Sequence, residues 1–180
     1  MQGDQKLIIQ FQESDNKEAP FTLLLKKYQQ KVYYQIKRMG IEHADADDIA
    51  QQVWIKVWNK LSGFKMESEF STWLFRVVYN ETLNFIQKNN RNAGSVLSDK
   101  ANYTTNNSTG TKNPTSSEIE IKLERALLQL PHKQRVVFVL RYFEAYSYEQ
   151  IGKIMNTTVG GAKANFHQAV KKIENFIKTV

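Results

Sequence analysis

The chain has 180 residues, enough for one ordinary domain or two small ones, and carries 25 Lys and Arg against 18 Asp and Glu, a net charge of +7. That balance favours anionic partners such as nucleic acid or an acidic protein surface, although moderate positive charge can also serve solubility alone. Cysteine is absent, which excludes disulfides, thiolate metal ligands and cysteine nucleophiles.

The amino terminus, MQGDQKLIIQ, lacks the basic start and long apolar stretch of a signal peptide. No apolar run approaches the roughly 18 residues that a membrane-spanning helix needs. We therefore expect a soluble, cytoplasmic protein with no direct membrane insertion.

A polar segment divides the chain. Residues 91–117, RNAGSVLSDKANYTTNNSTGTKNPTSS, are poor in large apolar side chains and cannot bury enough surface to offset their ordering entropy. The flanking sequences are periodic at helical spacing, with no strand pattern. We predict an all-α protein with two small helical domains, 1–90 and 118–180, joined by a flexible linker over 91–117. The second domain holds 10 basic and 6 acidic side chains, a net charge of +4, and is the more DNA-like of the two.

Three helices are expected in the first domain. Apolar spacing predicts one over residues 23–36 and another from about Asp45 to Leu61. A glycine-containing loop, SGFKMESE, follows at residues 62–69. The third helix then begins near Ser71, which we expect to be its N-cap.

Three aspartates cluster at the start of the second helix, in the stretch DADDIAQQVWIKVW. Asp45 is expected to cap this helix, with Asp47 and Asp48 in its first turn, where negative charge suits the helix macrodipole. The cluster also raises the alternative of a metal-dependent phosphoesterase, with His43 as a further ligand. Asp45 and Asp48 share a helix face, but Asp47 does not, and no distant cluster completes the six or so oxygen ligands of a hard cation. The stronger interpretation is an exposed surface on which Asp48 and Gln51 lie together.

Polar and aromatic side chains interleave along the outer positions of the third helix: Trp73, Arg76, Asn80, Asn84 and Lys88. Bases stack on aromatic rings while cations meet phosphates, so this pattern suits single-stranded DNA. Trp73 can equally belong to the core. The preceding loop, with Phe64 and Lys65, is a candidate for receiving an unstacked base.

In the second domain, residues 118–130 predict an amphipathic helix that Pro131 ends. The next segment, HKQRVVFVLRYFE, is apolar over most of its length. We expect it to be a helix within the core.

A helix-turn-helix pattern follows. Ser147 and Gln150 match a capping box at the start of a short helix, and Asn156 suits the left-handed conformation that ends it. Thr158 then caps a longer helix predicted over residues 159–178. In such a motif the second helix enters the major groove of duplex DNA. A helical hairpin that simply packs is the alternative.

The outer positions of residues 159–178 are polar or basic: Lys163, Asn165, His167, Gln168, Lys171 and Lys172. Gly160 and Gly161 at the start of this helix allow its backbone to approach a phosphate closely, where a helix N-terminus favours an anion.

These residues carry a family resemblance. The segments DADDIAQQVWIKVWNKLSGFK and SEFSTWLFRVVYNETLNFIQK resemble the second region of an extracytoplasmic-function (ECF) sigma factor of bacterial RNA polymerase. LPHKQRVVFVLRYFEAYSYEQIGKIMNTTVGGAKANFHQAVKKI resembles the fourth region of the same family. The order, the spacing and the polar linker agree, and the resemblance covers nearly the whole chain.

The resemblance implies three binding surfaces. The surface for the clamp helices of the polymerase's largest subunit comprises Asp45, Asp48, Gln51, Gln52, Trp54 and Ile55. The part that melts and reads the minus-ten promoter element comprises Phe64, Lys65, Ser71, Thr72, Trp73, Arg76, Asn80, Asn84 and Lys88. The reader of the minus-thirty-five element comprises Ser147, Thr158, Val159, Gly160, Gly161, Lys163, Ala164, Asn165, His167 and Lys171.

The implied partners are core RNA polymerase, including the flap of its second-largest subunit, promoter DNA in duplex and single-stranded form, and an anti-sigma factor. The linker would thread the RNA exit path. No catalytic residue, metal or cofactor is implied. A stand-alone helix-turn-helix regulator is the alternative function, but it leaves residues 1–90 without a role.

The sequence departs from the family pattern in two places. Gln51 and Gln52 stand where Gln-Glu is frequent, which removes one negative charge from the polymerase-binding surface. Asn165 and Gln168 stand where arginine is frequent, so bidentate recognition of guanine by arginine is not available at these positions.

Overall fold

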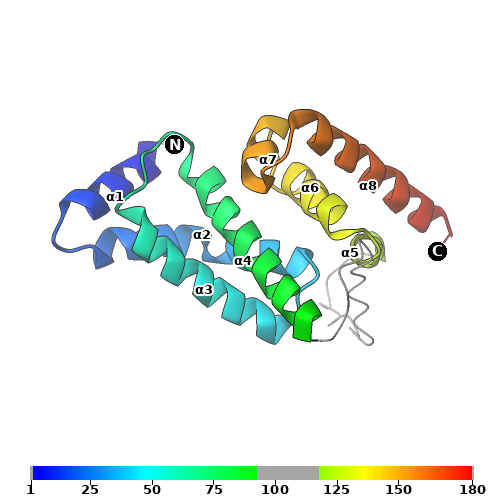
Figure 1. The fold of residues 1–180 in the computed structure, drawn as a ribbon, viewed down its shortest axis with the longest axis horizontal. Coiled ribbons are helices and arrows are strands. Elements are labelled where there is room, and N and C mark those ends of the chain that lie inside the picture. Colours follow the sequence, from blue (N-terminus) through cyan, green and yellow to red (C-terminus); the bar gives the residue numbers. More distant parts are fainter. Residues whose placement is uncertain (1, 93–117, 180) are drawn as a thin grey trace. The chain divides into compact units, whose positions relative to one another are not determined.

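The computed structural model describes residues 2–92 and 118–179. Its helices are α1 (Gln2–Glu13), α2 (Glu18–Arg38), α3 (His43–Leu61), α4 (Phe70–Asn92), α5 (Glu118–Leu128), α6 (His132–Tyr142), α7 (Tyr148–Met155) and α8 (Val159–Thr179) (Figure 1). No strand occurs in these two ranges, and the all-α prediction is confirmed. The predicted linker lies outside the described residues from position 93 onward, while α4 includes positions 91 and 92.

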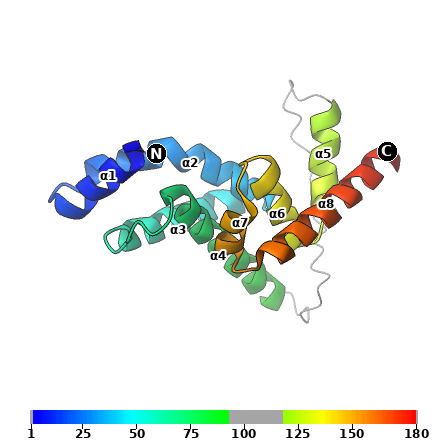
Figure 2. The ribbon, with the colours of Figure 1, turned by 90° about the horizontal axis from the view of Figure 1, so that it is seen from above.

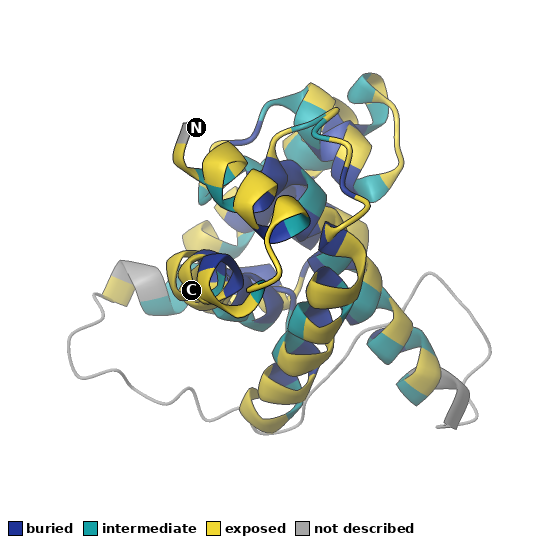
Figure 3. Cartoon of the chain, turned by 90° about the vertical axis from the view of Figure 1, so that its left-hand side faces the viewer, coloured by how far each residue is buried: buried dark blue, intermediate teal, exposed yellow. Residues whose placement is uncertain are grey.

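The chain divides into two compact units. Helices α1–α4 make up most of the first unit and α5–α8 most of the second. Each group can be followed from two directions in Figure 1 and Figure 2. Within the helices, buried and exposed positions alternate with helical spacing (Figure 3). In the described part of the chain, no helix is both long and apolar enough to cross a membrane.

Helix α1 is an element that the periodicity does not predict. Ile8 and Phe11 are its buried apolar side chains, and two positions one turn apart are too few for a clear periodic pattern. The ring of Phe11 packs at 6.0 Å from that of Phe21 and 5.2 Å from that of Trp58, measured between centroids. Such aromatic contacts stabilise α1 against α2 and α3.

Helix α3 begins two residues before the predicted cap. Glu42 is its N-cap residue and makes no side-chain cap hydrogen bond, while its carbonyl accepts the first helical hydrogen bond from the amide of Ala46 at 2.8 Å. The prediction that Asp45 caps the helix is therefore wrong. His43 and Asp47, one turn apart, contact each other across the additional residues, with His43 Nδ1 3.3 Å from the Asp47 carboxylate. Asp45 lies in the first turn instead, where its charge suits the macrodipole.

Helix α4 likewise begins earlier than predicted, at Phe70, and its start is marked by a hydrogen bond from the amide of Trp73 to the carbonyl of Glu69 at 3.1 Å. Ser71 is therefore inside the helix, and its assignment as N-cap is wrong. Phe70 is buried, and its ring packs against Tyr28 at a centroid distance of 5.4 Å. This packing draws Phe70 into the helix.

In the second unit, α5, α6 and α8 share an apolar core. Its buried members are Ala126, Leu127, Leu130, Phe138, Ala169 and Ile173. Leu127 and Leu130 lie in residues 118–130, the segment for which the sequence predicts an amphipathic helix. Residues 136–140 of α6 are all buried, so the prediction of a core helix is confirmed.

The caps of the helix-turn-helix follow the predictions. The Ser147 hydroxyl accepts from the amide of Gln150 at 3.2 Å, and the Gln150 side chain accepts from the amide of Ser147 at 2.8 Å, which confirms the capping box. Asn156, directly after α7, has a φ of 52°, as predicted for the residue that ends it. The Thr158 hydroxyl caps α8 by accepting from the amide of Gly161 at 3.0 Å.

Candidate nucleic-acid interface

The exposed side of α3 carries a stripe of four residues at intervals of three, four and seven positions: Asp48, Gln51, Gln52 and Ile55. This spacing places them on one helix face. Ile55 is 47% exposed, so it adds an apolar contact to two amides and a carboxylate. We refer to these four residues as the α3 stripe. It provides a mixed polar and apolar surface of the kind that a protein partner can bind.

The other two residues predicted for polymerase binding are placed differently. Asp45 precedes the stripe by one turn and is half-buried. Trp54 is half-buried on another side of α3, with its ring edge-on to Phe21 at a centroid distance of 6.0 Å. The structure thus brings four of the six predicted residues onto one exposed face.

The acidic cluster at the start of α3 does not resemble a metal site. His43 Nδ1 lies 3.3 Å from the carboxylate of Asp47 and 2.9 Å from the hydroxyl of Tyr33. Burial, and then the negative charge of Asp47, raise the pKa of Tyr33. Across residues 2–92 and 118–179, no group of three or more His, Asp and Glu side chains could hold a metal ion.

Helix α4 carries a second stripe: Trp73, Arg76, Asn80, Asn84 and Lys88. Successive members are three or four positions apart, and all are exposed except the half-buried Trp73. We refer to these residues as the α4 stripe. Along the helix the two amides lie between the two cations, and the ring of Trp73 precedes the first cation. This arrangement suits a single strand of nucleic acid.

Two further candidates of the minus-ten set are not exposed. Thr72 is 4% exposed, and its side chain faces the interior of the first unit. Its prediction as a DNA-binding residue is wrong for this conformation, because a buried hydroxyl cannot reach DNA. Ser71 is half-buried.

An aromatic cluster joins α4 to the loop at residues 62–69. The ring of Trp73 lies 5.0 Å from that of Phe64 and 5.8 Å from that of Phe70, measured between centroids. Phe64 is buried, so its ring supports Trp73 and is not itself open to a base. Lys65, the next residue, is exposed. Trp73 therefore packs against the cluster and still exposes part of its ring beside the α4 stripe.

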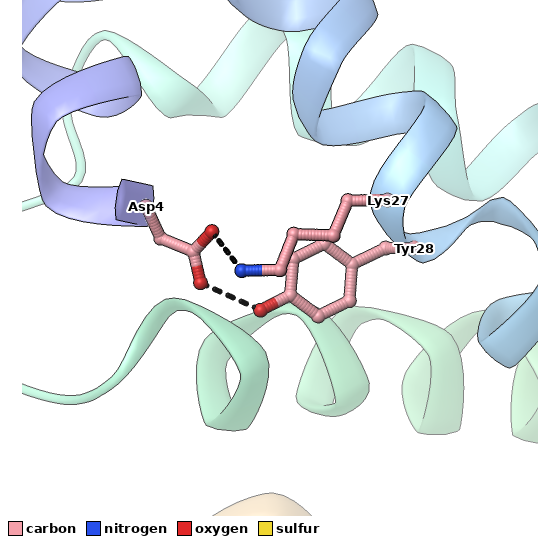
Figure 4. Close-up of polar contacts among 3 residues, drawn as sticks. All are labelled: Asp4, Lys27 and Tyr28. Atoms are coloured by element: carbon pink, nitrogen blue, oxygen red, sulfur yellow. Dashed lines mark hydrogen bonds and ion pairs between the residues drawn. The ribbon is translucent and has the colours of Figure 1, made fainter. Parts of the chain in front are cut away.

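A cavity of about 340 Å³ lies beside the same loop, with α1, α2 and the start of α4 around it. Asp4, Lys27 and Tyr28 line one side. The carboxylate of Asp4 accepts from Lys27 Nζ at 2.5 Å and from the Tyr28 hydroxyl at 2.7 Å (Figure 4). The sequence pattern did not reveal these residues, because their proximity depends on the packing of α1.

Helix α8 presents a third polar face. Gly160, Lys163, Ala164, His167 and Lys171 are exposed, and their spacing places them on one side of the helix. We refer to these five residues as the α8 face. Lys163 lies between the small residues Gly160 and Ala164, and Lys171 follows two turns later, so a nucleic-acid backbone can come close to the start of the helix and meet positive charge.

Other residues predicted to read the minus-thirty-five element form hydrogen bonds within the helix-turn-helix. The side-chain amide of Asn165 is half-buried and donates to the carbonyl of Gly161 at 2.8 Å. The hydroxyls of Ser147 and Thr158 make the caps described above. Val159 is half-buried.

Two residues that the sequence did not suggest lie close to Lys163. The guanidinium of Arg141 is 5.0 Å from the ring centroid of Tyr148, and Lys163 Nζ is 5.8 Å from it. Arg141 also donates to the carbonyl of Tyr146 at 2.8 Å. Tyr148 directly follows Ser147 of the capping box, so the sequence carries a signal that places it near the start of the helix-turn-helix. Arg141 lies in α6 and reaches this site only through the fold.

Comparison with known families gives two matches. Residues 24–92 match Sigma-70 region 2, and residues 120–173 match Sigma-70, region 4. The first match contains the α3 stripe and the α4 stripe, and the second contains the α8 face. Helix α1 precedes the first match.

Two curated relatives are similar along nearly their full lengths. The ECF RNA polymerase sigma-E factor of Haemophilus influenzae is 31% identical over 97% of this chain and 95% of its own. The RNA polymerase sigma-H factor of Pseudomonas aeruginosa is 30% identical over 97% of this chain and 94% of its own.

Solved structures show the same fold. The sigma factor RpoE of Bartonella quintana, in complex with the anti-sigma factor NepR, superposes with a TM-score of 0.73 at 22% identity, covering 88% of this chain and 96% of RpoE. CnrH, in complex with the cytosolic domain of CnrY, gives a TM-score of 0.71 at 18% identity and 98% coverage of both chains. With both Sigma-70 regions present in order and relatives that match from end to end, the chain belongs to the ECF group of RNA polymerase sigma factors.

Proposed function

We propose that this sigma factor binds core RNA polymerase, directs it to promoters and assists DNA melting, with no catalytic residue and no cofactor of its own. The observation that carries the proposal is the presence of three exposed faces of different character within the two Sigma-70 regions. One is suited to protein, one to single-stranded DNA and one to duplex DNA. A stand-alone helix-turn-helix regulator would use only the last of them.

The α3 stripe binds the clamp helices of the polymerase's largest subunit in this proposal. Asp48 supplies a carboxylate, and Gln51 and Gln52 supply amides that can donate and accept. Ile55 adds apolar area at 47% exposure. Because the core of α3 is formed by other residues, including Val53 and Val57, binding on this stripe requires no unfolding.

The α4 stripe and the loop at residues 62–69 read the minus-ten element once its strands separate. Exposed Arg76 and Lys88 meet phosphates, Asn80 and Asn84 bind base edges, and the exposed part of Trp73 stacks on a base. The loop supplies Lys65. Amides suit this role because they can pair with both donors and acceptors on an unpaired base.

The α8 face reads the minus-thirty-five element in the major groove. Lys163 and Lys171 supply phosphate contacts, and His167 is exposed between them along the helix. Arg141 adds a second cation beside this face, and the ring of Tyr148 contacts both Arg141 and Lys163. The second unit also binds the flap of the polymerase's second-largest subunit.

We also infer regulation by an anti-sigma factor, because a similar fold, the sigma factor RpoE, has been solved with the anti-sigma factor NepR. The protein acts in the cytoplasm, where the polymerase is found.

The proposal is tested by run-off transcription with purified core polymerase. Genomic fragments selected by the reconstituted holoenzyme serve as templates, and core enzyme without the sigma factor is the control. We expect initiation at defined start sites only when the sigma factor is present. The absence of initiation above core alone would contradict the proposal.

A further inference from the structure

The side chain of Gln12 connects three parts of the first unit. Gln12 lies in the last turn of α1 and is half-buried. Its Nε2 donates to the carbonyl of Leu61 at 3.1 Å and to the carbonyl of Phe64 at 2.9 Å, with the carbonyl of Ser62 farther away at 3.5 Å. One amide from α1 therefore binds both the last residue of α3 and the beginning of the loop at residues 62–69.

These carbonyls need donors. The last carbonyls of a helix have no partner within it, so the end of α3 depends on groups from elsewhere. The amide of Phe64 supplies one by donating to the carbonyl of Leu61 at 3.1 Å. The carbonyl of Phe64 accepts from the same Gln12 Nε2 that binds the carbonyl of Leu61. A residue of α1 thus restrains the peptide that carries the Phe64 carbonyl.

Two further features constrain the loop at residues 62–69. Met66 has a φ of 55°, a left-handed conformation that is costly for a residue other than glycine. The buried ring of Phe64 supports Trp73 at a centroid distance of 5.0 Å. A conformation with such a cost persists only where its surroundings hold it. The hydrogen bonds from Gln12 are part of that restraint.

We infer that Gln12 is a positioning residue for base selection in the minus-ten element. It holds the loop in the one shape that places Lys65 and Trp73 correctly for an unpaired base, without contacting DNA or polymerase itself. This inference rests on the proposed function of the α4 stripe and its loop. Gln12 precedes residue 24, where the match to Sigma-70 region 2 begins, so that match does not assign it a role.

Loss of the restraint should affect selection more than binding. A loop that samples several shapes can still meet phosphates with Lys65, because charge attraction tolerates small displacements. Discrimination between bases depends on a difference in affinity that requires fixed geometry. The expected result is relaxed base preference with little change in affinity for core polymerase.

Three substitutions of Gln12 separate the possibilities. Gln12→Leu and Gln12→Glu remove the donor and keep a similar volume. Gln12→Lys keeps a donor on a side chain long enough to reach the same carbonyls. Gln10→Leu is the matched control, because Gln10 is exposed on the same helix.

The first measurement is hydrogen exchange of the full-length protein. We expect amides of residues 62–69 to exchange about fivefold faster in Gln12→Leu and Gln12→Glu, the factor that one neutral hydrogen bond typically provides. Exchange in the interiors of α2 and α3 should match that of the wild type. Unchanged exchange in the loop of both donor-free variants would overturn the inference.

The second measurement is selection from duplex DNA with a randomised minus-ten region, using holoenzyme reconstituted with each variant. The wild type and Gln10→Leu should enrich the same bases. Gln12→Leu and Gln12→Glu should lose about fivefold of that preference at one or more positions, and Gln12→Lys should restore it. Identical base preferences in all variants would overturn the role of Gln12.

The result for the wild type separates this inference from the proposed function. If the wild-type holoenzyme selects promoters but the donor-free variants select the same ones, only the role of Gln12 fails. If the wild type supports no selection above core alone, the proposed function fails and the inference fails with it.

Discussion

Arg135 closes the carboxyl end of α5 from within the second unit. Its Nε donates to the carbonyl of Leu127 at 2.7 Å, and its Nη2 donates to the carbonyls of Leu128 and Leu130 at 2.7 and 3.1 Å. These carbonyls are at and beyond the end of the helix, where the regular helical hydrogen bonds stop, and the carbonyl of Leu127 also accepts from the amide of Leu130 at 3.1 Å. Burial lowers the pKa of Arg135 to about 10, so the guanidinium remains charged at neutral pH.

Replacing this side chain should destabilise the second unit. We expect Arg135→Leu to reduce its free energy of unfolding by about 2–3 kcal/mol, because several carbonyls lose a charged donor. Hydrogen exchange of the amides in α5 and α6 measures the change. Arg125→Leu, on the exposed side of α5, is the matched control and should change stability by less than about 0.5 kcal/mol. Equal protection in both variants would count against this role.

The sequence predicts the helix caps of the helix-turn-helix correctly, but it does not predict the first residues of α3 and α4. Ser147, Asn156 and Thr158 were assigned correctly because each acts within a few positions of its own backbone. Ser71 was assigned wrongly because Phe70 is drawn into α4 by contact with Tyr28, which is distant in the sequence. A cap is a local property, whereas the burial that moves a helix boundary comes from tertiary packing.

Among the elements, the turn between α7 and α8 depends on Gly152. A Cβ at this position would lie 2.8 Å from the carbonyl oxygen of Thr157, whose amide in turn donates to the carbonyl of Gly152 at 3.0 Å. Gly152→Ala should therefore destabilise the second unit by about 1–3 kcal/mol, because backbone must move.

The control for this substitution is Gly160→Ala, since a Cβ there would meet nothing within 4 Å. Thermal unfolding followed by far-ultraviolet circular dichroism compares the two variants. We expect a lower melting temperature for Gly152→Ala alone. If the two variants melt together, the close approach at Gly152 is not a constraint.

The α8 face makes a prediction about salt. Lys163 is exposed there, and replacing it with alanine should remove one phosphate contact. We expect affinity for upstream promoter duplex to fall about fivefold at low salt, with the slope of log K against log salt reduced by about 1. Fluorescence anisotropy at several salt concentrations measures both. Lys178→Ala, at the far end of α8, is the control, and an unaltered slope for Lys163→Ala would remove this residue from the interface.

The α3 stripe makes a separate prediction about polymerase. Replacing both Asp48 and Gln51 with alanine should weaken binding to core polymerase by about fivefold to tenfold, the effect of losing roughly one to two polar contacts. Helicity should be unchanged, because both side chains are exposed. A quantitative pull-down measures the affinity, with Asp15→Ala and Gln29→Ala on other exposed surfaces as the control. Undiminished binding would reject the assignment of this stripe.

For the molecule as a whole, the sequence predicts the order of the two helical domains, but it does not predict the role of α1. The all-α fold and the helix-turn-helix follow from repeated apolar spacing and from caps, which sequence displays directly. Helix α1 is defined instead by single contacts from Asp4, Phe11 and Gln12 to distant residues. Asp4 lines one side of the cavity, and Gln12 restrains the loop. This part of the candidate site therefore needed the structure.

The division into two units leads to a test of how the surfaces cooperate. The α3 stripe and the α8 face belong to different units, so substitutions in them should act independently. Lys163→Ala should leave affinity for core polymerase unchanged, and the Asp48 and Gln51 substitutions should leave affinity for upstream duplex unchanged.

Combining the three substitutions should therefore multiply their effects on transcription. At subsaturating sigma factor and template, run-off initiation by the combined variant should fall by the product of the two separate losses, because polymerase binding and duplex binding both precede initiation. A heat-treated template with pre-separated strands should not restore the part of the loss that comes from Asp48 and Gln51, because that part reflects weaker binding to core polymerase. A combined variant no worse than the weaker of its two parents would mean that both substitutions disturb one shared surface, which is incompatible with separate roles for α3 and α8.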